Sequence, residues 1–274
     1  MSKVENSWFE LDRILLRFAF ERAAYRYDQA PLALIHLEIG NRLIERLELI
    51  KIQPELVLDF GCATGAVTAM VIKKYNLAQV IGLEMASSMV DRARKRIPFL
   101  YNFHGLVGNP EKLPLASCSC DLIFSNLSLH WFHDLEQVFS EFSRVLKPGG
   151  ALLFSTLGPD TLIELRSSWQ IIDKYNHVNF FIDMRDIGDA LVRARLAGPV
   201  LDVEKLTLTY PSVDRLTRDL KMLGAANVTA GRNRGLTGKV RWQAMCANYA
   251  QLQQADGLLP ITCEVVYGHA WNPL

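Results

Sequence analysis

The chain has 274 residues, of which 50% are hydrophobic and 22% are charged, and its formal net charge at pH 7 is +1. This composition predicts a folded domain with a large core, and the balanced charge gives no reason to expect nucleic acid or a membrane as partner. No stretch is apolar for long enough to span a bilayer, and residues 1–13 lack the apolar core of a signal peptide, so we expect a cytoplasmic protein.

The five cysteines predict no disulfide framework, because their number is odd and their spacing is irregular. Cys118 and Cys120 are separated by a single residue, which is too close for a usual pair of zinc ligands, and no second pair follows. His130 and His133 lack carboxylate or cysteine partners at a suitable spacing. We therefore expect reduced thiols and no bound metal.

Apolar spacing predicts the elements in chain order. Residues 15–30 and 32–50 carry apolar side chains three and four positions apart, which predicts two helices separated at Pro31. From residue 55 onward, short apolar runs alternate with helical segments, which predicts a parallel sheet with helices on both faces. The expected strands span residues 55–60, 78–84, 102–108, 120–126 and 151–157, and the expected helices span residues 66–75, 87–97 and 135–146.

Two local signals suggest where these helices begin and end. Ser87 is the expected N-cap of its helix. The sequence Pro148-Gly149-Gly150 is expected to end the helix before it and to turn the chain into the strand at 151–157.

The pattern changes after Leu157. Helices are predicted for residues 160–175, 184–198 and 213–225 and from Trp242 onward, and strands are predicted for residues 203–210 and 262–271. We expect these two strands to complete the sheet, and the added helices and loops to cover the site. The chain 1–274 is interpreted as one domain, with an N-terminal helical lid at 1–50, a core at 51–157 and a substrate-binding part at 158–274.

The first chemical signal is the sequence VLDFGCATGAV at Val57–Val67. A strand ends near Asp59, and the chain then turns through Gly61 and Gly65. Gly61 allows a ligand to approach the backbone, Gly65 allows the next helix to start close to the sheet, and free amides at that helix N-terminus suit polar ligand groups. A tight turn without a ligand would show the same glycines, so the turn alone is weak evidence.

Glu84 strengthens this interpretation, because it ends the next strand, where a carboxylate can accept hydrogen bonds from both hydroxyls of a ribose. The turn lacks the G-x-G-x-x-G spacing that a pyrophosphate needs, and it has no P-loop lysine. A mononucleoside that carries an amino acid therefore fits better than NAD or ATP.

This order of motifs resembles the class I S-adenosylmethionine-dependent methyltransferases, whose fold is an α/β, Rossmann-like sheet with helices on both faces. Their third block corresponds to GNPEKLP at residues 108–114, and their PGG also follows a helix. The resemblance implies S-adenosylmethionine as cofactor. Ala63 stands where the family has its middle glycine, and Asn109 stands where it has an Asp that often meets the adenine amino group. The implied cofactor contacts are Asp59, Gly61, Ala63, Gly65, Glu84, Met85, Asn109, Pro110 and Asn126.

The remaining chain resembles a narrower family. Residues 20–28, 125–181, 219–239 and 259–273 are similar to the BioC family, the malonyl-acyl-carrier-protein O-methyltransferases of biotin synthesis. The resemblance implies that the free carboxyl of a malonyl thioester is methylated, and that the ester masks its charge while the chain is elongated toward pimeloyl. It also implies that an acyl carrier protein presents the substrate.

The implied reaction depends on alignment more than on proton transfer. A carboxylic acid with a pKa of about 4 is already ionised at neutral pH, so no general base is required. Tyr27 is the first candidate to close over the methyl donor, since an aromatic face tolerates a sulfonium, although a Tyr packed on a helix would look the same. His130 and Trp131 follow a strand end, where open α/β sheets place ligands, and are candidates for the methyl-transfer pocket. Trp131 would also suit a core.

Charge is uneven along the chain. Residues 215–241 hold seven Lys or Arg and one acid, Asp219, so this segment carries +6 in a chain of +1. A basic, glycine-rich segment predicts an acidic partner, although a solvated face or nucleic acid would fit the same charge. The family resemblance favours the acidic carrier protein. The docking candidates are Arg232, Arg234, Lys239 and Arg241.

Two other functions remain open. One is a methyltransferase with another acceptor, such as malonyl-CoA or a quinone precursor. The other is an assembly factor or binding module that holds S-adenosylmethionine without transferring the methyl group, although the intact turn and Glu84 argue against a degenerate site. Consumption of S-adenosylmethionine separates an enzyme from a module, and the choice of acceptor separates the enzymes.

Overall fold

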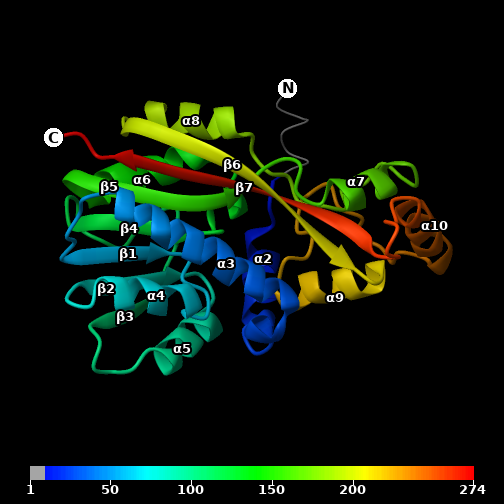
Figure 1. The fold of residues 1–274 in the computed structure, drawn as a ribbon, viewed down its shortest axis with the longest axis horizontal. Coiled ribbons are helices and arrows are strands. Elements are labelled where there is room, and N and C mark those ends of the chain that lie inside the picture. The colour runs from blue at the N-terminus through cyan, green and yellow to red at the C-terminus, as the bar shows by residue number, and fades with distance from the viewer. Residues whose placement is uncertain (1–9) are drawn as a thin grey trace.

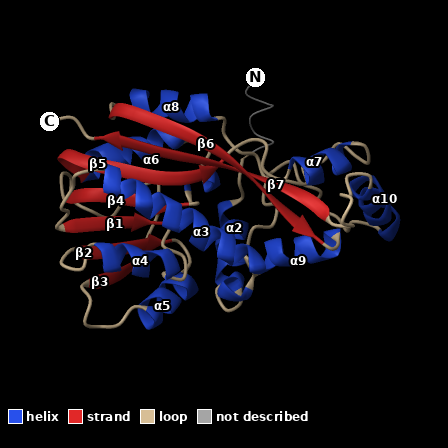
Figure 2. Ribbon diagram, in the orientation of Figure 1, coloured by secondary structure: helices blue, strands red, loops and turns tan. Residues whose placement is uncertain are grey.

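The computed structural model describes residues 10–274. The prediction that the chain has no signal peptide was made from residues 1–13, most of which lie outside the described residues. The centre of the structure is a seven-stranded sheet with the order β3-β2-β1-β4-β5-β7-β6 (Figures 1 and 2). The strands are β1 (Leu56–Phe60), β2 (Gln79–Glu84), β3 (Phe103–Val107), β4 (Cys120–Asn126), β5 (Leu146–Leu157), β6 (Ala197–Tyr210) and β7 (Leu259–Trp271).

Strands β1 to β5 pair in parallel, whereas β7 runs antiparallel to both β5 and β6. The predicted fold class, a Rossmann-like methyltransferase sheet that the C-terminal strands complete, is confirmed.

The helices are α2 (Arg13–Ala23), α3 (Pro31–Arg46), α4 (Ala66–Lys74), α5 (Ser87–Arg96), α6 (Leu135–Val145), α7 (Ile163–Gln170), α8 (Met184–Arg193), α9 (Val213–Met222) and α10 (Lys239–Ala250). Short 3₁₀ turns are η1 (Tyr27–Gln29), η2 (Leu47–Leu49) and η3 (Leu129–Trp131).

The two-residue period of the strands sorts the core into two faces. Val57 of β1 belongs to the cluster that α3 and α4 cover with Ile39 and Val71. The next residue, Leu58, belongs to the cluster on the opposite face, to which α6 contributes Phe142. Strand β1 is therefore buried on both sides, which explains why its sequence is a nearly continuous apolar run, whereas no residue of the edge strand β3 is buried.

The last two strands carry a second group of elements. In Figure 1, β6 and β7 run past the carboxyl ends of the parallel strands toward α7, α9 and α10. These elements have their own apolar cluster, which includes Trp169, Leu216, Met245 and Ile261. The site-bearing ends of β1, β2 and β4 are thus covered by structure that comes from the C-terminal part of the chain. Within residues 10–274, no helix combines the length and apolar character needed to cross a membrane.

Two predicted boundary signals are wrong. Ser87 is the first helical residue of α5 and not its cap, because the Glu21 carboxylate of α2 accepts from the Ser87 and Ser88 amides at 2.7 and 2.9 Å. A distant carboxylate thus replaces the local hydroxyl at this helix start. The segment 148–150 does not precede β5 but lies within it, because β5 begins at Leu146 and its register with β4 shifts there.

Other boundaries differ in the segments with weak apolar signals. β6 begins at Ala197, well before the predicted start at residue 203, because its first residues lie largely exposed at the sheet edge. α10 begins at Lys239 instead of Trp242, and α7 covers only part of residues 160–175. α2 ends at Ala23, so Tyr27 lies in the separate turn η1.

Candidate active site

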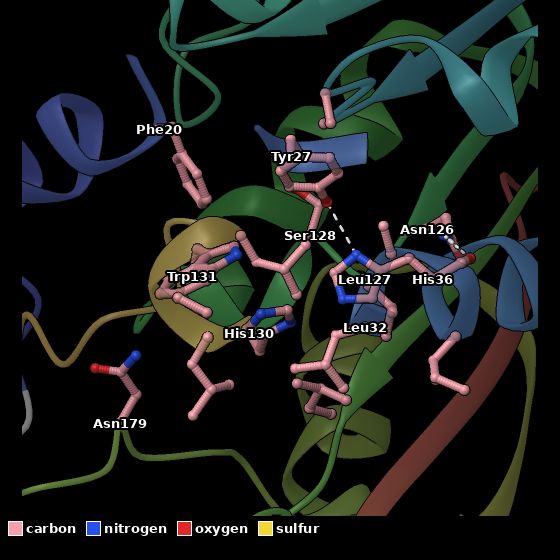
Figure 3. Close-up of a pocket in the computed structure, with 18 of the residues that line it drawn as sticks. Phe20, Tyr27, Leu32, His36, Asn126, Leu127, Ser128, His130, Trp131 and Asn179 are labelled. Atoms are coloured by element: carbon pink, nitrogen blue, oxygen red, sulfur yellow. Dashed lines mark hydrogen bonds between the residues drawn. The ribbon is translucent and has the colours of Figure 1, made fainter. Parts of the chain in front are cut away.

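A cavity of about 460 Å³ lies at the carboxyl ends of β1, β2 and β4 and continues beneath the C-terminal elements (Figure 3). Its walls come from three parts of the chain: the loops after those strands, the segment from α2 to α3, and the elements from α7 to β7. The predicted site residues that it brings together are Tyr27, Asp59, Gly61, Ala63, Glu84, Met85, Pro110, Asn126, His130 and Trp131.

The glycine turn lies against two neighbouring elements. Gly61 has a φ of +80°, and a Cβ there would lie 2.1 Å from the Ser128 Oγ in the loop after β4. Gly65 has a φ of +77°, and a Cβ there would lie 2.8 Å from the Ala93 Cβ on α5. Ala63 between them is also left-handed, with a φ of +45°. A side chain at either glycine would therefore push the turn away from the structure that shapes the cavity.

Asp59 lies beneath this turn with 2% of its surface exposed. Its Oδ2 accepts a hydrogen bond of 2.6 Å from the Thr68 hydroxyl of α4. Burial raises the pKa of Asp59 to about 7 against the opposing effect of this hydrogen bond, and the nearby Glu84 charge adds to the rise. In the free protein this carboxyl is therefore partly protonated at neutral pH, and a cation bound beside it would favour the carboxylate.

Glu84 connects the end of β2 to the glycine turn. Its Oε1 accepts from the amides of Met85 at 2.7 Å and Ala86 at 3.3 Å, and its Oε2 accepts from the Ala63 amide at 3.3 Å. Burial raises its pKa, and these three hydrogen bonds oppose the rise. A carboxylate offers about four acceptor positions, so at least one remains for a ligand hydroxyl in the cavity.

Asp28 fastens the turn η1 to the side of the cavity that the glycine turn forms. Its Oδ1 accepts from the Thr64 hydroxyl at 2.7 Å, and its Oδ2 forms an ion pair with Arg96 at the end of α5. These partners lie 36 and 68 residues away along the chain. No local signal could have revealed them, although together they determine where the neighbouring Tyr27 stands.

Tyr27 projects into the cavity from η1, and its hydroxyl oxygen lies 2.9 Å from Nδ1 of His36 on α3 (Figure 3). Burial, followed by the charges of Glu84 and Asp28, raises the pKa of Tyr27 above its ordinary value. Burial lowers the pKa of His36 to about 4. The pair is therefore neutral at pH 7. His36 lines the cavity but is not among the predicted site residues, because its neighbours in the first turns of α3 are apolar and give no chemical motif.

Asn126 and the η3 residues form the wall after β4. The Asn126 amide donates to the His36 carbonyl at 3.0 Å and accepts from the Ser155 hydroxyl at 2.8 Å, so it joins α3 to β4 and β5. Trp131 packs edge to face against Phe20 of α2 with ring centroids 5.3 Å apart. These contacts link the N-terminal helices to the sheet. Asn126 and Trp131 also line the cavity.

Asn109 does not line the cavity. Its side chain is exposed to solvent, and its Oδ1 accepts from the Glu111 amide at 3.0 Å, so it shapes its own turn. The adjacent Pro110 is buried and is the residue of this block that reaches the cavity wall. The expected contact of Asn109 with an adenine amino group stays a prediction.

The basic segment divides into buried and exposed cations. Arg232 is 18% exposed, donates to the Thr229 carbonyl at 2.8 Å and lies 3.5 Å from the Asp12 carboxylate, so it fastens its loop to the start of α2. Its guanidinium is therefore largely engaged within the protein, and its docking role stays a prediction. The exposed docking candidates are Arg234, Lys239 and Arg241.

The acid of this segment, Asp219, is 0% exposed on the inner side of α9. Arg232 is also turned inward, so residues 215–241 keep six exposed cations and no exposed acid, and their surface carries the same +6 as the segment. The part of the chain that the structure describes contains no group of three or more His, Cys, Asp or Glu side chains that could hold a metal ion. The five cysteines are free thiols.

Known proteins resemble this chain at two levels. Residues 58–154 match the Methyltransferase domain family. A malonyl-[acyl-carrier protein] O-methyltransferase of Methylovorus sp. (strain MP688) is 47% identical over 269 residues, which cover 96% of this chain and 90% of that protein.

Solved structures share the fold at low identity. The YcgJ protein of Bacillus subtilis has a TM-score of 0.60 and 16% identity, over 85% of this chain and 98% of that one. A phosphoethanolamine N-methyltransferase 2 of Haemonchus contortus, solved in complex with S-adenosyl-L-methionine, has a TM-score of 0.55 and 16% identity, over 93% of this chain and 57% of that one.

Proposed function

The chain belongs to the family of malonyl-[acyl-carrier protein] O-methyltransferases, and from this membership we infer that it methylates the free carboxyl of malonyl-acyl carrier protein. S-adenosylmethionine, the cofactor, supplies the methyl group from a sulfonium cation. The product is a malonyl methyl ester, which starts the pimeloyl chain of biotin.

The observation that best supports a carboxyl acceptor is the chemistry of the two histidines in the cavity. Burial lowers the pKa of His36 to about 4 and that of His130 to about 3. Neutral histidines with such values are weak proton acceptors. A phenolic acceptor such as a quinone precursor, with a pKa of about 10, would need a base, whereas a malonyl carboxylate is already ionised.

The residues around the glycine turn fit S-adenosylmethionine. Gly61 and Ala63 present backbone instead of large side chains to the cavity, and Glu84 offers a buried acceptor for ribose hydroxyls. The ionised form of Asp59 would be favoured by the cationic groups of the cofactor. Met85 and Pro110 line the same end of the cavity and give apolar contact.

Tyr27 is proposed to cover the methyl donor. Asp28 holds the turn η1 at Thr64 and Arg96, and His36 holds the Tyr27 hydroxyl, so the ring is fixed from both ends. A fixed ring supports the alignment of two reacting groups, and misplacement of such a group lowers the rate without changing the chemistry.

Replacing Tyr27 with Phe is expected to lower kcat about 5- to 50-fold, because the ring loses the hydrogen bond that orients it. The free energy of unfolding should fall by about 0.5–1.5 kcal/mol, the usual net contribution of one hydrogen bond. Steady-state kinetics and urea denaturation measure the two quantities. Tyr25→Phe is the matched control, because Tyr25 is 67% exposed and should be insensitive. Wild-type turnover in Tyr27→Phe would show that the Tyr27 hydroxyl does not contribute to the reaction.

The acidic carrier protein is proposed to dock on the exposed cations of the basic segment. Arg234, Lys239 and Arg241 lie on the loop before α10 and at its start, and Trp242 of the same helix lines the cavity. The substrate arm would thus enter from the side where the positive charge is concentrated. Complementary charge raises the association rate most at low ionic strength.

The double variant Arg234→Glu/Lys239→Glu is expected to raise KM for malonyl-acyl carrier protein about 5- to 20-fold, and the effect should shrink as salt is added. KM for malonyl-CoA, which lacks the carrier protein, should stay unchanged. Lys51→Glu/Lys73→Glu is the control, because it makes the same charge change at exposed residues that lie outside the basic segment and do not line the cavity. Equal KM values for both double variants would show that the carrier protein docks on another surface.

The function itself is tested by mass spectrometry of malonyl-acyl carrier protein after incubation with the protein and S-adenosylmethionine. We expect the carrier-bound group to gain one methylene, and acetyl-acyl carrier protein, which lacks the free carboxyl, to remain unmodified. Methylation of malonyl-CoA with none of the carrier-bound substrate would instead favour the small thioester. No transfer to either would contradict the proposal.

A further inference from the structure

One polar atom in the cavity wall lacks a partner inside the protein. His130 lies in η3 with 9% of its surface exposed, and its Nδ1 is buried without a hydrogen bond among the described residues. Leaving a buried donor or acceptor unpaired destabilises a protein, so native structures contain few such atoms. Such an atom, in a residue that lines a cavity, is available to pair with a polar group of a ligand.

The surroundings of this ring are aromatic and apolar. The ring centroid of His130 lies 4.7 Å from that of the adjacent Trp131 (Figure 3). It lies 5.8 Å from the ring centroid of Phe181. Burial, and then the proximity of His36, keeps the imidazole uncharged at neutral pH. A neutral imidazole has one N–H donor and one acceptor, and its tautomer is determined by its partners.

We propose that His130 donates a hydrogen bond from Nδ1 to the malonyl carboxylate, at the oxygen that does not receive the methyl group. This inference rests on the proposed function. A carboxylate only accepts hydrogen bonds, so it selects the tautomer with the proton on Nδ1. The loop that carries His130 directly follows β4, next to Ser128, which contacts the glycine turn at Gly61.

A neutral donor suits this reaction better than a cation. A close ion pair would stabilise the attacking carboxylate and weaken it as a nucleophile, whereas one neutral hydrogen bond orients the group and leaves it reactive. The cations of the cavity wall are placed for other contacts. Arg96 is paired with Asp28, and Lys221 is exposed on α9.

Two variants test the assignment, His130→Leu and His130→Gln. His130→Leu is expected to raise KM for malonyl-acyl carrier protein roughly 10- to 100-fold, the usual effect of losing a hydrogen bond to a charged group. The dissociation constants for S-adenosylmethionine and for acetyl-acyl carrier protein should stay within about twofold of wild type, since neither ligand carries the malonyl carboxylate. His130→Gln keeps an N–H donor and should restore most of the loss.

The exposed His104 on β3 provides the control, and His104→Leu should leave all of these constants at their wild-type values. If His130→Leu retains the wild-type KM, or if His130→Leu and His130→Gln weaken the binding of every ligand equally, the proposal is overturned. The first outcome would show that His130 makes no hydrogen bond to the malonyl carboxylate. The second would show that the side chain of His130 maintains the structure of the cavity.

A measurement on the unmutated protein covers the case in which His130→Leu does not fold. Nitrogen NMR of ¹⁵N-histidine-labelled protein, with S-adenosylhomocysteine present to prevent turnover, reports the tautomer of His130. Addition of malonyl-acyl carrier protein should place the proton on Nδ1, and addition of acetyl-acyl carrier protein should not. A proton on Nε2 in the presence of malonyl-acyl carrier protein would overturn the inference, whereas a wild-type protein that methylates no malonyl thioester would overturn the proposed function instead.

Discussion

Replacing Glu84 with Gln is expected to raise the dissociation constant for S-adenosylmethionine about 100-fold while the fold is retained. Hydrogen bonds from hydroxyls to a charged carboxylate contribute about 1.5–3 kcal/mol each, and the amide removes that charge. The new NH₂ group would also face the Ala63 amide, which now donates to Oε2 at 3.3 Å. Two opposing donors would loosen the glycine turn. The remaining amide oxygen can still accept from Met85 and Ala86, so the start of α5 is preserved.

Isothermal titration calorimetry with S-adenosylmethionine measures this effect, and thermal unfolding of the free protein reports whether the fold is intact. Glu48→Gln serves as the control, because Glu48 is 72% exposed and pairs with Lys74 at the surface across 3.4 Å. It loses the same charge and should bind the cofactor normally. Wild-type affinity in a folded Glu84→Gln variant would exclude the ribose assignment.

Replacing Gly61 with Ala is expected to destabilise the protein by about 2–5 kcal/mol and to weaken cofactor binding at least about tenfold. The left-handed φ of +80° contributes about 1–2 kcal/mol of this cost for a residue with a Cβ. The rest comes from overlap, since the new Cβ would lie 2.1 Å from the Ser128 Oγ and 2.5 Å from its Cβ. The turn or the loop after β4 must move, and both line the cavity.

Gly198→Ala separates the two contributions. Gly198 also has a positive φ, +55°, but a Cβ there would meet nothing within 4 Å. This control should lose only about 1–2 kcal/mol and should bind S-adenosylmethionine as the wild type does. Urea denaturation and calorimetry of both variants provide the comparison. Equal losses of stability, with full affinity in both, would show that the contact between Gly61 and Ser128 is unimportant.

Local patterns were sufficient for the strands that carry the cofactor turn. Residues 55–60 and 78–84 were predicted as strands because continuous apolar runs mark a parallel sheet buried on both faces, and β1 and β2 lie there. The start of α5 was predicted less well, because its amides bind Glu21 of α2 and not the adjacent Ser87 hydroxyl. The edge strand β6 was predicted too short, since half-exposed residues give a weak apolar signal.

The candidate site shows the same division. Gly61, Glu84 and Tyr27 were predicted as site residues from motifs whose members are close in sequence, and all three line the cavity. His36 was not predicted as a site residue although it lines the cavity, and the inward partner of Arg232 was not foreseen, because both depend on contacts between distant parts of the chain. Sequence charge alone could not distinguish Arg232, whose guanidinium lies near Asp12, from an exposed cation.

The sequence by itself determined the alternation of strands and helices, the glycine turn with its strand-terminal acid, and the family to which the chain belongs, because these depend on residues that are neighbours or periodic in the chain. Only the tertiary structure decided that Tyr27 meets His36 in a cavity, that Asp28 is held by Thr64 and Arg96, and that His130 is buried with an unpaired nitrogen. Such contacts depend on how helices and loops pack over the sheet. Packing sets burial, and burial sets the protonation and the free hydrogen-bonding positions of these side chains.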